Sequence, residues 1–140
     1  IGMLKTNVDA FSFNVSIDSV IMGGDRESAM APNLNGSTYF LLNLNKSFYL
    51  NVSASYKSDY YFSDNHNQKS TPYSLFNLSF GYKFKNLEIN LWMRNLFDQI
   101  YETRGFYFGL IPPDFEDELF KSYADPRQVG ISLNHQVLKK

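Results

Sequence analysis

The sequence contains no cysteine, so a disulfide and a thiolate metal site are both excluded, and the redox state of the compartment is left open. It also has no apolar run of about 18 residues, which excludes a transmembrane helix but not a membrane-spanning strand. Neither sign of charge is in excess: 13 Lys and Arg against 14 Asp and Glu give a net charge of −1, which argues against a nucleic-acid partner. There is no signal peptide, and the chain begins at Ile1 instead of Met, so we expect a fragment of a longer protein.

Aromatic side chains are abundant, with 13 Phe, 10 Tyr and one Trp making up 17% of the residues. Apolar and polar residues alternate most clearly at 87–94, where only Trp92 interrupts the polar set. A period of two places the two sets on opposite faces of a strand. The same alternation predicts six strands, at 9–22, 38–44, 48–62, 74–84, 87–94 and 128–137. The predicted loops are 23–33, 63–72 and 105–125.

The short turns between the predicted strands test whether the strands share one sheet. Turns at 45–47 and 85–86 would set these residues opposite each other: Leu44 and Phe48, Leu42 and Leu50, Phe40 and Val52, Phe84 and Leu87, Tyr82 and Ile89, Phe80 and Leu91. Opposed residues of an antiparallel pair share a face, and a slip of one residue would mix the faces. Since every partner is apolar, we predict one continuous antiparallel sheet with one wholly apolar face.

The lengths of the connections alternate along the chain. Short polar turns fall near Lys5–Thr6, Asn45–Lys46 and Lys85–Asn86, and the longer loops lie between them. Short turns at one end of a sheet and long loops at the other are typical of outer-membrane barrels. The apolar face would then contact lipid and the polar face would line the lumen. The core side of a soluble sandwich, with a solvated outer face, is the alternative, but it would require a second sheet.

Several segments resemble one protein family. Arg94-Asn95-Leu96-Phe97-Asp98, followed by Tyr101 and Arg104-Gly105-Phe106, is similar to the penultimate strand of TonB-dependent outer-membrane receptors. Asp125-Pro126-Arg127-Gln128-Val129-Gly130 is similar to the start of the last strand in that family. Two upstream segments also look familial, Ala31-Pro32 and Tyr60-Tyr61-Phe62-Ser63-Asp64. The pieces occur in the expected order and cover nearly the whole chain.

The resemblance implies an all-β fold, an antiparallel up-and-down meander of six strands that forms a segment of a large transmembrane β-barrel in the cell outer membrane. Residues 1–140 would be the C-terminal portion of a barrel of about 22 strands, without its plug domain. Such receptors import scarce nutrients, commonly iron–siderophore complexes. The implied partners are outer-membrane lipid, the missing N-terminal strands, the plug domain and a small-molecule nutrient. TonB would be contacted by the plug and not by this segment.

One position departs from the family pattern. Receptors of this family usually end on an outward-facing aromatic residue that the assembly machinery reads. By alternation after Leu133 and His135, that position is Val137, and it is followed by Leu138-Lys139-Lys140. The sequence therefore leaves open how the chain is assembled, and it does not identify the nutrient.

The sequence offers few candidate site residues. It has no paired nucleophile and base, no glycine loop for phosphate and no metal quartet, so we expect neither an enzyme nor a cofactor. Lys69, Arg104 and Tyr107 lie in predicted loops and are the candidates for ligand contact. Arg94, on the polar face, is expected to be an unpaired surface charge, with Glu88 or Asp18 as the alternative partner.

Three loop features each have two interpretations. Tyr60-Tyr61-Phe62 is expected to be an interfacial girdle, with ligand stacking as the alternative. His66 is expected to be a solvated loop histidine, because a metal ligand would need convergent partners. The acidic group of Asp114, Glu116, Asp117 and Glu118 is expected to be solvated, since it lacks the ligand spacing of a calcium loop.

A soluble or small-barrel lipid-binding protein is the competing class. Such a carrier would turn the apolar face inward around its ligand. It would need about eight strands, and it would not need long loops at one end only. Dependence on detergent would favour the receptor, and binding of a fatty acid by water-soluble protein would favour the carrier.

Overall fold

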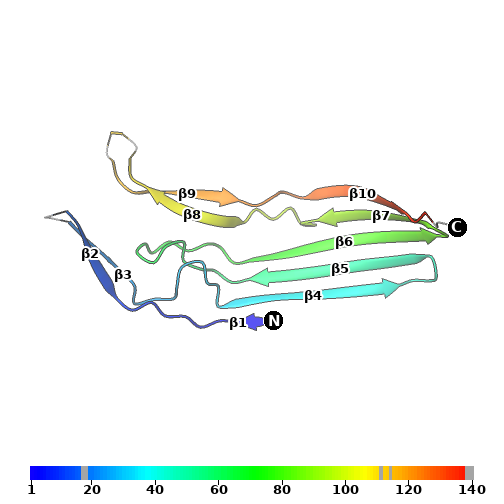
Figure 1. Cartoon of the computed structure of the whole chain (residues 1–140), viewed down its shortest axis with the longest axis horizontal. Coiled ribbons are helices and arrows are strands. Elements are labelled where there is room, and N and C mark those ends of the chain that lie inside the picture. Colours follow the sequence, from blue (N-terminus) through cyan, green and yellow to red (C-terminus); the bar gives the residue numbers. More distant parts are fainter. Residues whose placement is uncertain (17–18, 111, 114, 138–140) are drawn as a thin grey trace. The chain divides into compact units, whose positions relative to one another are not determined.

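The computed structural model describes residues 1–16, 19–110, 112–113 and 115–137, and the regular elements in them are strands. In chain order they are β1 (Gly2–Met3), β2 (Phe11–Ser16), β3 (Ser19–Gly23), β4 (Leu34–Asn43), β5 (Phe48–Lys57), β6 (Tyr73–Phe84), β7 (Leu87–Arg94), β8 (Glu102–Phe108), β9 (Glu118–Tyr123) and β10 (Gln128–His135). The largest sheet has six strands in the order β1-β4-β5-β6-β7-β10, while β2–β3 and β8–β9 form sheets of two strands each (Figure 1). The described residues contain no helix that is long and apolar enough to cross a membrane.

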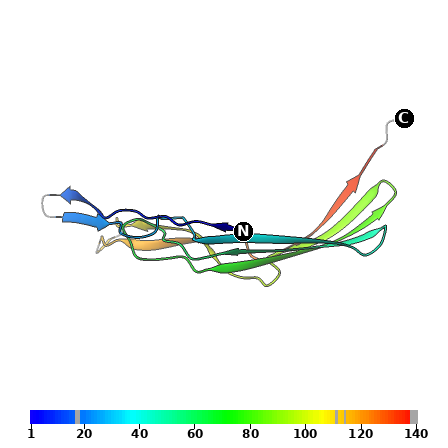
Figure 2. The same ribbon diagram turned by 90° about the horizontal axis from the view of Figure 1, so that it is seen from below.

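The chain divides into two compact units. The loop unit comprises Ile1–Asn35, Lys57–Tyr73 and Ile100–Ala124, and the sheet unit comprises Gly36–Tyr56, Ser74–Gln99 and Asp125–Lys140. In the sheet unit, β4 to β7 and β10 run beside one another in both views (Figures 1 and 2). The loop unit contains the two small hairpins and the segment between β5 and β6.

The predicted register of the β6–β7 hairpin is confirmed. Phe80 pairs with Leu91, and the other two predicted pairs of this hairpin are also formed. β10 extends the same rows, because Ile131 lies opposite Leu91 and Leu133 lies opposite Ile89. Apolar rows therefore run across three neighbouring strands on one face.

The β4–β5 hairpin has the turn that the sequence predicts. The backbone N–H of Leu44 donates to the carbonyl of Phe48 at 3.0 Å, as the predicted three-residue turn requires. The two turns lie next to each other, since the N–H of Lys83 donates to the carbonyl of Ser47 at 2.7 Å. The ring of Phe48 also stacks against Phe80 on the apolar face, with centroids 5.5 Å apart.

The apolar face is exposed. The exposed fractions reach 57% for Phe40, 50% for Leu42, 49% for Leu91, 66% for Ile131 and 70% for Leu133. Side chains of this size are normally removed from water in a stable fold, and a contiguous exposed patch marks an interaction surface. The sheet unit therefore presents an apolar surface that requires an apolar neighbour.

Two segments that carry the family resemblance brace each other where β7 ends. Asn95 is 6% exposed and has a φ of 49°, a left-handed conformation that asparagine tolerates better than most residues. Its Nδ2 donates to the carbonyls of Gln99 at 2.9 Å and Asp125 at 3.4 Å. Nearby, the N–H of Arg127 donates to Oδ1 of Asp98 at 2.7 Å. The end of β7 is thus fixed to the start of β10.

Several predicted segments are corrected by the structure. The predicted strand 9–22 is a hairpin, β2–β3, in which Phe13 lies opposite Ile21, and it is separate from the six-stranded sheet. Alternation has the same period in one long strand and in two short ones, so it does not reveal the reversal. Ile17 and Asp18 of this segment lie outside the described residues. The edge position in the sheet is occupied by β1 instead.

The other corrections concern segment ends and loops. β5 ends at Lys57 and not at residue 62, and β4 begins at Leu34, four residues before the prediction. The predicted loop 105–125 is largely the β8–β9 hairpin, whose rings Phe106 and Phe120 face each other. The predicted turn near Lys5–Thr6 lies in the irregular chain between β1 and β2, where Oγ1 of Thr6 accepts the N–H of Ser28 at 3.0 Å.

Candidate functional site

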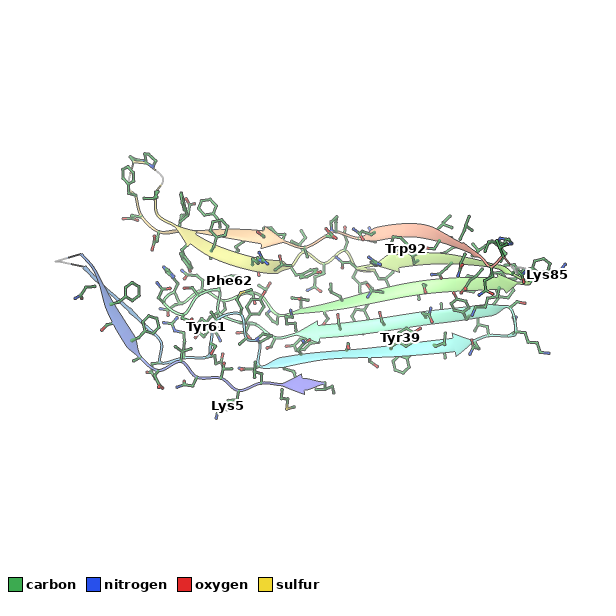
Figure 3. The ribbon with its side chains drawn as sticks, in the orientation of Figure 1. Lys5, Tyr39, Tyr61, Phe62, Lys85 and Trp92 are labelled. Atoms are coloured by element: carbon green, nitrogen blue, oxygen red, sulfur yellow. The ribbon has the colours of Figure 1, made fainter. Side chains whose placement is uncertain are left out.

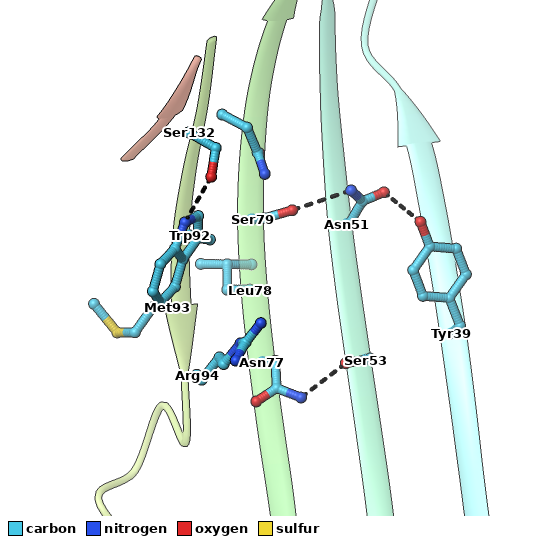
Figure 4. A pocket seen from close by; sticks show the side chains of 11 residues that line it. Tyr39, Asn51, Ser53, Asn77, Leu78, Ser79, Trp92, Met93, Arg94 and Ser132 are labelled. Carbon is cyan, nitrogen blue, oxygen red and sulfur yellow. Dashed lines mark hydrogen bonds between the residues drawn. The ribbon is translucent and has the colours of Figure 1, made fainter. Parts of the chain in front are cut away.

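The polar face of the sheet unit holds a groove of about 350 Å³, which we call the polar groove (Figure 4). Its lining comes from β4, β5, β6, β7 and β10 and includes Tyr39, Asn51, Ser53, Asn77, Ser79, Asn90, Trp92, Arg94 and Ser132. These residues alternate with those of the apolar face, as the sequence predicted. Tyr39 and Trp92 also appear on β4 and β7 in the wider view of the side chains (Figure 3).

Hydrogen bonds between side chains cross the strands inside the polar groove. The hydroxyl of Tyr39 donates to Oδ1 of Asn51 at 2.7 Å, and Nδ2 of Asn51 donates to Oγ of Ser79 at 3.0 Å. Nδ2 of Asn77 donates to Oγ of Ser53 at 3.1 Å. These bonds place Tyr39 and Asn51 on one face, so their neighbours Phe40 and Val52 share the opposite, apolar face. The predicted pair of Phe40 and Val52 therefore lies on the same face of the sheet as Phe80 and Leu91.

Glycines let two aromatic rings lie flat on this face. A Cβ on Gly81 would come within 1.9 Å of Tyr49, and a Cβ on Gly130 within 2.2 Å of Trp92. The rings thus occupy the space above the glycine backbone, an arrangement that compensates for the missing side chain in a strand. Nε1 of Trp92 also donates to Oγ of Ser132 at 3.0 Å.

Among the described residues, Arg94 and Glu88 have separate neighbours, so the alternative pairing of these two residues is not formed. The guanidinium of Arg94 lies 5.2 Å from the centre of the Trp92 ring. Glu88 accepts a hydrogen bond from the hydroxyl of Tyr49 and lies 3.9 Å from Nζ of Lys83. Asp18, the other suggested partner of Arg94, lies outside the described residues. Oδ1 of Asn90 is buried without a hydrogen-bond partner among the described residues, so the polar groove can accept a donor.

In the loop unit, the segment 61–66 is fixed to the segment 24–30. The N–H of Gly24 donates to the carbonyl of Asp64 at 2.9 Å, and the N–H of Ala29 donates to its Oδ1 at 2.7 Å. The guanidinium of Arg26 donates to the carbonyl of His66 at 2.7 Å. These backbone and side-chain hydrogen bonds hold the segments 24–30 and 61–66 together.

The same segment packs on the β8–β9 hairpin through buried rings. Tyr60 is 4% exposed and Phe62 is 6% exposed, so the predicted interfacial girdle is wrong for both. The hydroxyl of Tyr60 donates to the carbonyl of Thr103 at 3.2 Å, and burial raises its pKa. The ring of Phe62 lies over Gly105, where an added Cβ would come within 2.6 Å of it. Figure 3 labels Phe62 and the neighbouring Tyr61 in the segment between β5 and β6.

Glu102 is a buried charge in the loop unit, with a side chain that is 8% exposed. Burial by itself would raise its pKa, but the N–H and hydroxyl of Thr71 at 2.8 and 2.9 Å, together with Nζ of Lys121 at 2.9 Å, hold it below the ordinary value. The ion pair in turn raises the pKa of Lys121. This network joins the end of the 58–72 segment to both strands of the hairpin.

Two of the three candidate ligand residues, Lys69 and Arg104, line neither the polar groove nor a second cavity described below. Nζ of Lys69 lies 3.1 Å from Asp59 and 3.5 Å from Glu27, and it sits over the ring of Tyr61 at 4.4 Å. The hydrogen bond to Asp59 raises the pKa of Lys69. Arg104 lies opposite Ser122 in the hairpin and is exposed. Ligand contact by Lys69 and Arg104 stays a prediction.

Tyr107, the third candidate, lines a cavity of about 580 Å³ that we call the loop pocket. The lining consists of Phe11, Phe13, Ala29, Phe62, Ser63, Asp64, Asn65, His66, Gly105, Phe106 and Tyr107. The rings of Tyr107 and His66 stack with centroids 3.5 Å apart and planes 8° apart. The Tyr107 hydroxyl donates to Oε1 of Gln68, and burial raises its pKa, so it stays a neutral phenol.

His66 is not the solvated histidine that the sequence suggested. Its side chain is 23% exposed, and its Nε2 lies 3.4 Å from Oδ2 of Asp117. Nδ1 lies 3.1 Å from Oγ of Ser63. Of the acidic group, Glu116 and Glu118 are exposed as expected, and Asp114 lies outside the described residues. The described residues hold no group of three or more His, Asp or Glu placed to bind a metal ion.

The aromatic lining of the loop pocket was missed in the sequence. Phe11 and Phe13 alternate with polar residues, a pattern that predicts the apolar face of a strand in the main sheet. Gly105, between Arg104 and Phe106, was the available signal, because a glycine among bulky strand residues marks a close approach of another group. The segment that approaches it, through Phe62, could not be identified from the sequence.

Comparison with known proteins supports the fold. No family model matches the sequence. Among solved structures, the chain is similar to the ferric yersiniabactin uptake receptor FyuA from Yersinia pestis, with a TM-score of 0.65 and 16% sequence identity. The match covers 85% of this chain and 20% of that chain, so this chain spans about a fifth of the receptor's length. The shared fold confirms the predicted class, an all-β antiparallel meander built as a segment of a large barrel.

Proposed function

We propose that the chain forms part of the wall and the outer loops of a TonB-dependent outer-membrane receptor that imports a scarce small-molecule nutrient, an iron–siderophore complex. The observation that carries the proposal is a six-stranded sheet with one mainly apolar face that bears large exposed side chains and one hydrogen-bonded polar face. The similarity in fold to a ferric yersiniabactin uptake receptor also supports this proposal.

Hydrocarbon is the neighbour that suits the apolar face. Rows such as Phe80, Leu91 and Ile131 run straight across the strands, and these three residues are 38%, 49% and 66% exposed. In water such a patch would drive aggregation, whereas a bilayer removes it from water without any further protein. The longer strands of this sheet, β4 to β7 and β10, are then the membrane spans.

The remaining surfaces take the roles that the receptor requires. The polar groove faces the lumen, where the plug domain of the whole receptor would lie. The loop unit contributes to the outer vestibule, and TonB acts through the plug and not through residues 1–140. β1 and β10 are the edges of the sheet, where the missing barrel strands would pair. Those open edges also argue against a closed small barrel that carries lipid.

Two adjacent leucines on β4 give a matched test of the lipid face. Leu42 is 50% exposed on the apolar face, and Leu41 is 51% exposed on the face of Tyr39. An arginine in the lipid costs about 2–4 kcal/mol at the bilayer centre, and one in the lumen costs little. We expect Leu42→Arg to reduce folding into lipid vesicles, measured by heat-modifiable migration, and Leu41→Arg to have a small effect. Equal effects of the two variants would overturn the membrane assignment.

The proposal that the nutrient is an iron–siderophore complex can be tested in cells. Deleting the gene that encodes this chain should abolish growth on an iron–siderophore complex as the sole iron source, and the intact gene should restore it. The control is growth on a high concentration of ferrous iron, which does not require a receptor. Unchanged uptake of every ferric chelate in the deletion strain would refute the iron assignment while leaving the membrane assignment standing.

A further inference from the structure

The short turns at one end of the sheet unit carry an excess of positive charge. The turns lie side by side, because the N–H of Lys83 donates to the carbonyl of Ser47 at 2.7 Å. The end of β10 joins them, because the N–H of Gln136 donates to the carbonyl of Asn86 at 2.9 Å. The Lys, Arg, Asp and Glu side chains in residues 42–48, 82–88 and 133–137 are Lys46, Lys83, Lys85 and Glu88.

Two of these lysines lie on opposite faces of the β6–β7 hairpin. On the polar face, Nζ of Lys83 lies 3.9 Å from Oε1 of Glu88. Nζ of Lys85 instead lies 5.3 Å from the centre of the Phe84 ring, and Phe84 pairs with Leu87 on the apolar face. Figure 3 labels Lys85 at the turn between β6 and β7. Lys85 thus extends its ammonium beside the apolar face, and it forms no ion pair with any of the described residues.

The last apolar row marks an edge of the apolar face. Phe84 is 52% exposed, and the row from Phe84 through Leu87 continues to His135, which lies opposite Leu87 on β10. A polar ring therefore ends this row. Long basic side chains at such a boundary keep their stems on apolar surface and their charged ends in the polar layer. Lys85 therefore lies where hydrocarbon would give way to lipid headgroups.

Lys46 occupies the neighbouring turn, which has a fixed conformation. Oδ1 of Asn45 accepts the N–H of Ser47 at 2.8 Å and the N–H of Phe48 at 2.9 Å. Lys46 is exposed at the tip of this turn, and Leu44, just before the turn, is 59% exposed. Since the two turns are hydrogen-bonded to each other, Lys46 adds its charge to the same edge of the sheet.

We propose that Lys46 and Lys85, which we call the basic border, bind the phosphate of an anionic phospholipid whose acyl chains lie on the apolar face. Charge complementarity selects this occupant, because the border is positive and lies beside a surface that requires an apolar neighbour. A phospholipid supplies the negative charge and the hydrocarbon in one molecule, whereas a free anion supplies only the charge. The proposal rests on the proposed receptor function, because it takes the apolar face to be the lipid face.

The test measures which phospholipid the full chain retains when it is folded in detergent micelles. Native mass spectrometry counts bound dioleoyl phosphatidylglycerol, which is anionic, and dioleoyl phosphatidylcholine, which has the same acyl chains and no net charge. We expect the anionic lipid to bind more tightly by about tenfold or more. This preference should shrink as the concentration of ammonium acetate is raised, because salt screens exposed charges.

Three variants locate the binding charge. Lys46→Gln and Lys85→Gln should each weaken phosphatidylglycerol about fivefold and leave phosphatidylcholine unchanged. Lys83→Gln is the matched control, since it removes the same charge from the same hairpin but on the polar face. It should leave both lipids unchanged. Heat-modifiable migration checks that each variant is folded.

The outcomes separate this proposal from its alternatives. Equal retention of the two lipids by the wild type would overturn the headgroup site. Equal losses in Lys83→Gln and Lys85→Gln would also overturn it, and they would place the anion in a cavity of about 240 Å³ that both lysines line. Glycerophosphoglycerol is the same headgroup without acyl chains. If it bound as tightly as the lipid, the border would be a site for free anions and the proposal would fail.

These results are independent of the membrane test. Failure of the headgroup site would leave the receptor proposal standing if Leu42→Arg and Leu41→Arg still differ in their folding into vesicles. Conversely, a selective loss of phosphatidylglycerol in Lys85→Gln, together with equal effects of the two arginine variants, would retain the headgroup site and refute the receptor wall.

Discussion

Lys121 reaches across the β8–β9 hairpin to Glu102, with Nζ 2.9 Å from Oε1 of a carboxylate that is otherwise enclosed. The other carboxylate oxygen accepts the N–H and the hydroxyl of Thr71. One buried side chain thus joins three segments of the loop unit, and its removal should loosen all of them together.

We expect Glu102→Gln to destabilise the loop unit locally by about 1–2 kcal/mol, because a neutral amide cannot pair with the ammonium of Lys121. Hydrogen exchange should increase in residues 58–72 and 100–124 and remain unchanged in β6 and β7. Glu116→Gln is the matched control, since Glu116 is an exposed carboxylate in the same stretch of chain, and its effect should stay below about 0.5 kcal/mol. Equal exchange in the two variants would contradict a structural role for Glu102.

The same carboxylate predicts a dependence on pH. The pKa of Glu102 is lower in the folded chain than its ordinary value of 4.5, so its contribution to stability is present above that value and is lost as pH falls through the folded pKa. Protection factors in residues 100–124, corrected for intrinsic exchange, should therefore fall in acid in the wild type. In Glu102→Gln this part of the acid response should be missing. Parallel curves for the two proteins would show that other groups cause the acid response.

The sequence predicts the sheet better than it predicts the loops, for a physical reason. Pairs such as Phe80 and Leu91 follow from alternation and the length of one turn, both of which are local properties. The loop pocket depends on Phe62, Gly105 and Phe11 meeting from distant segments, and a period of two does not encode such contacts. The same limitation explains why β2 and β3 were read as a single strand.

Gly130 should not tolerate a larger side chain. A Cβ there would lie 2.2 Å from Trp92, so Gly130→Ala must displace the indole and break its hydrogen bond to Ser132. We expect a loss of about 1–3 kcal/mol in the free energy of unfolding, measured with urea in detergent, and a shifted emission maximum, since Trp92 is the single tryptophan. Gly2→Ala is the control, because its nearest neighbour would be the carbonyl oxygen of Asn35 at 3.7 Å. An unchanged emission maximum in Gly130→Ala would contradict the packing of the ring on the glycine.

Asn95 provides both a left-handed backbone conformation and side-chain hydrogen bonds. Substitution by glycine or by alanine separates these two contributions. Its φ of 49° is permitted to glycine and unfavourable for alanine, and its side chain bonds the backbone of Gln99 and Asp125. Asn95→Gly keeps the conformation and loses the bonds, so we expect a cost of about 1–3 kcal/mol.

Asn95→Ala loses both functions and should cost about 1 kcal/mol more than Asn95→Gly. Urea unfolding gives the two values, and hydrogen exchange should show β10 (residues 128–135) loosening first, because Asp125 connects Asn95 to that strand. If the alanine and glycine variants were equally stable, the left-handed backbone would contribute nothing. If the glycine variant matched the wild type, the bonds to Gln99 and Asp125 would not be what fixes the start of β10 to the end of β7.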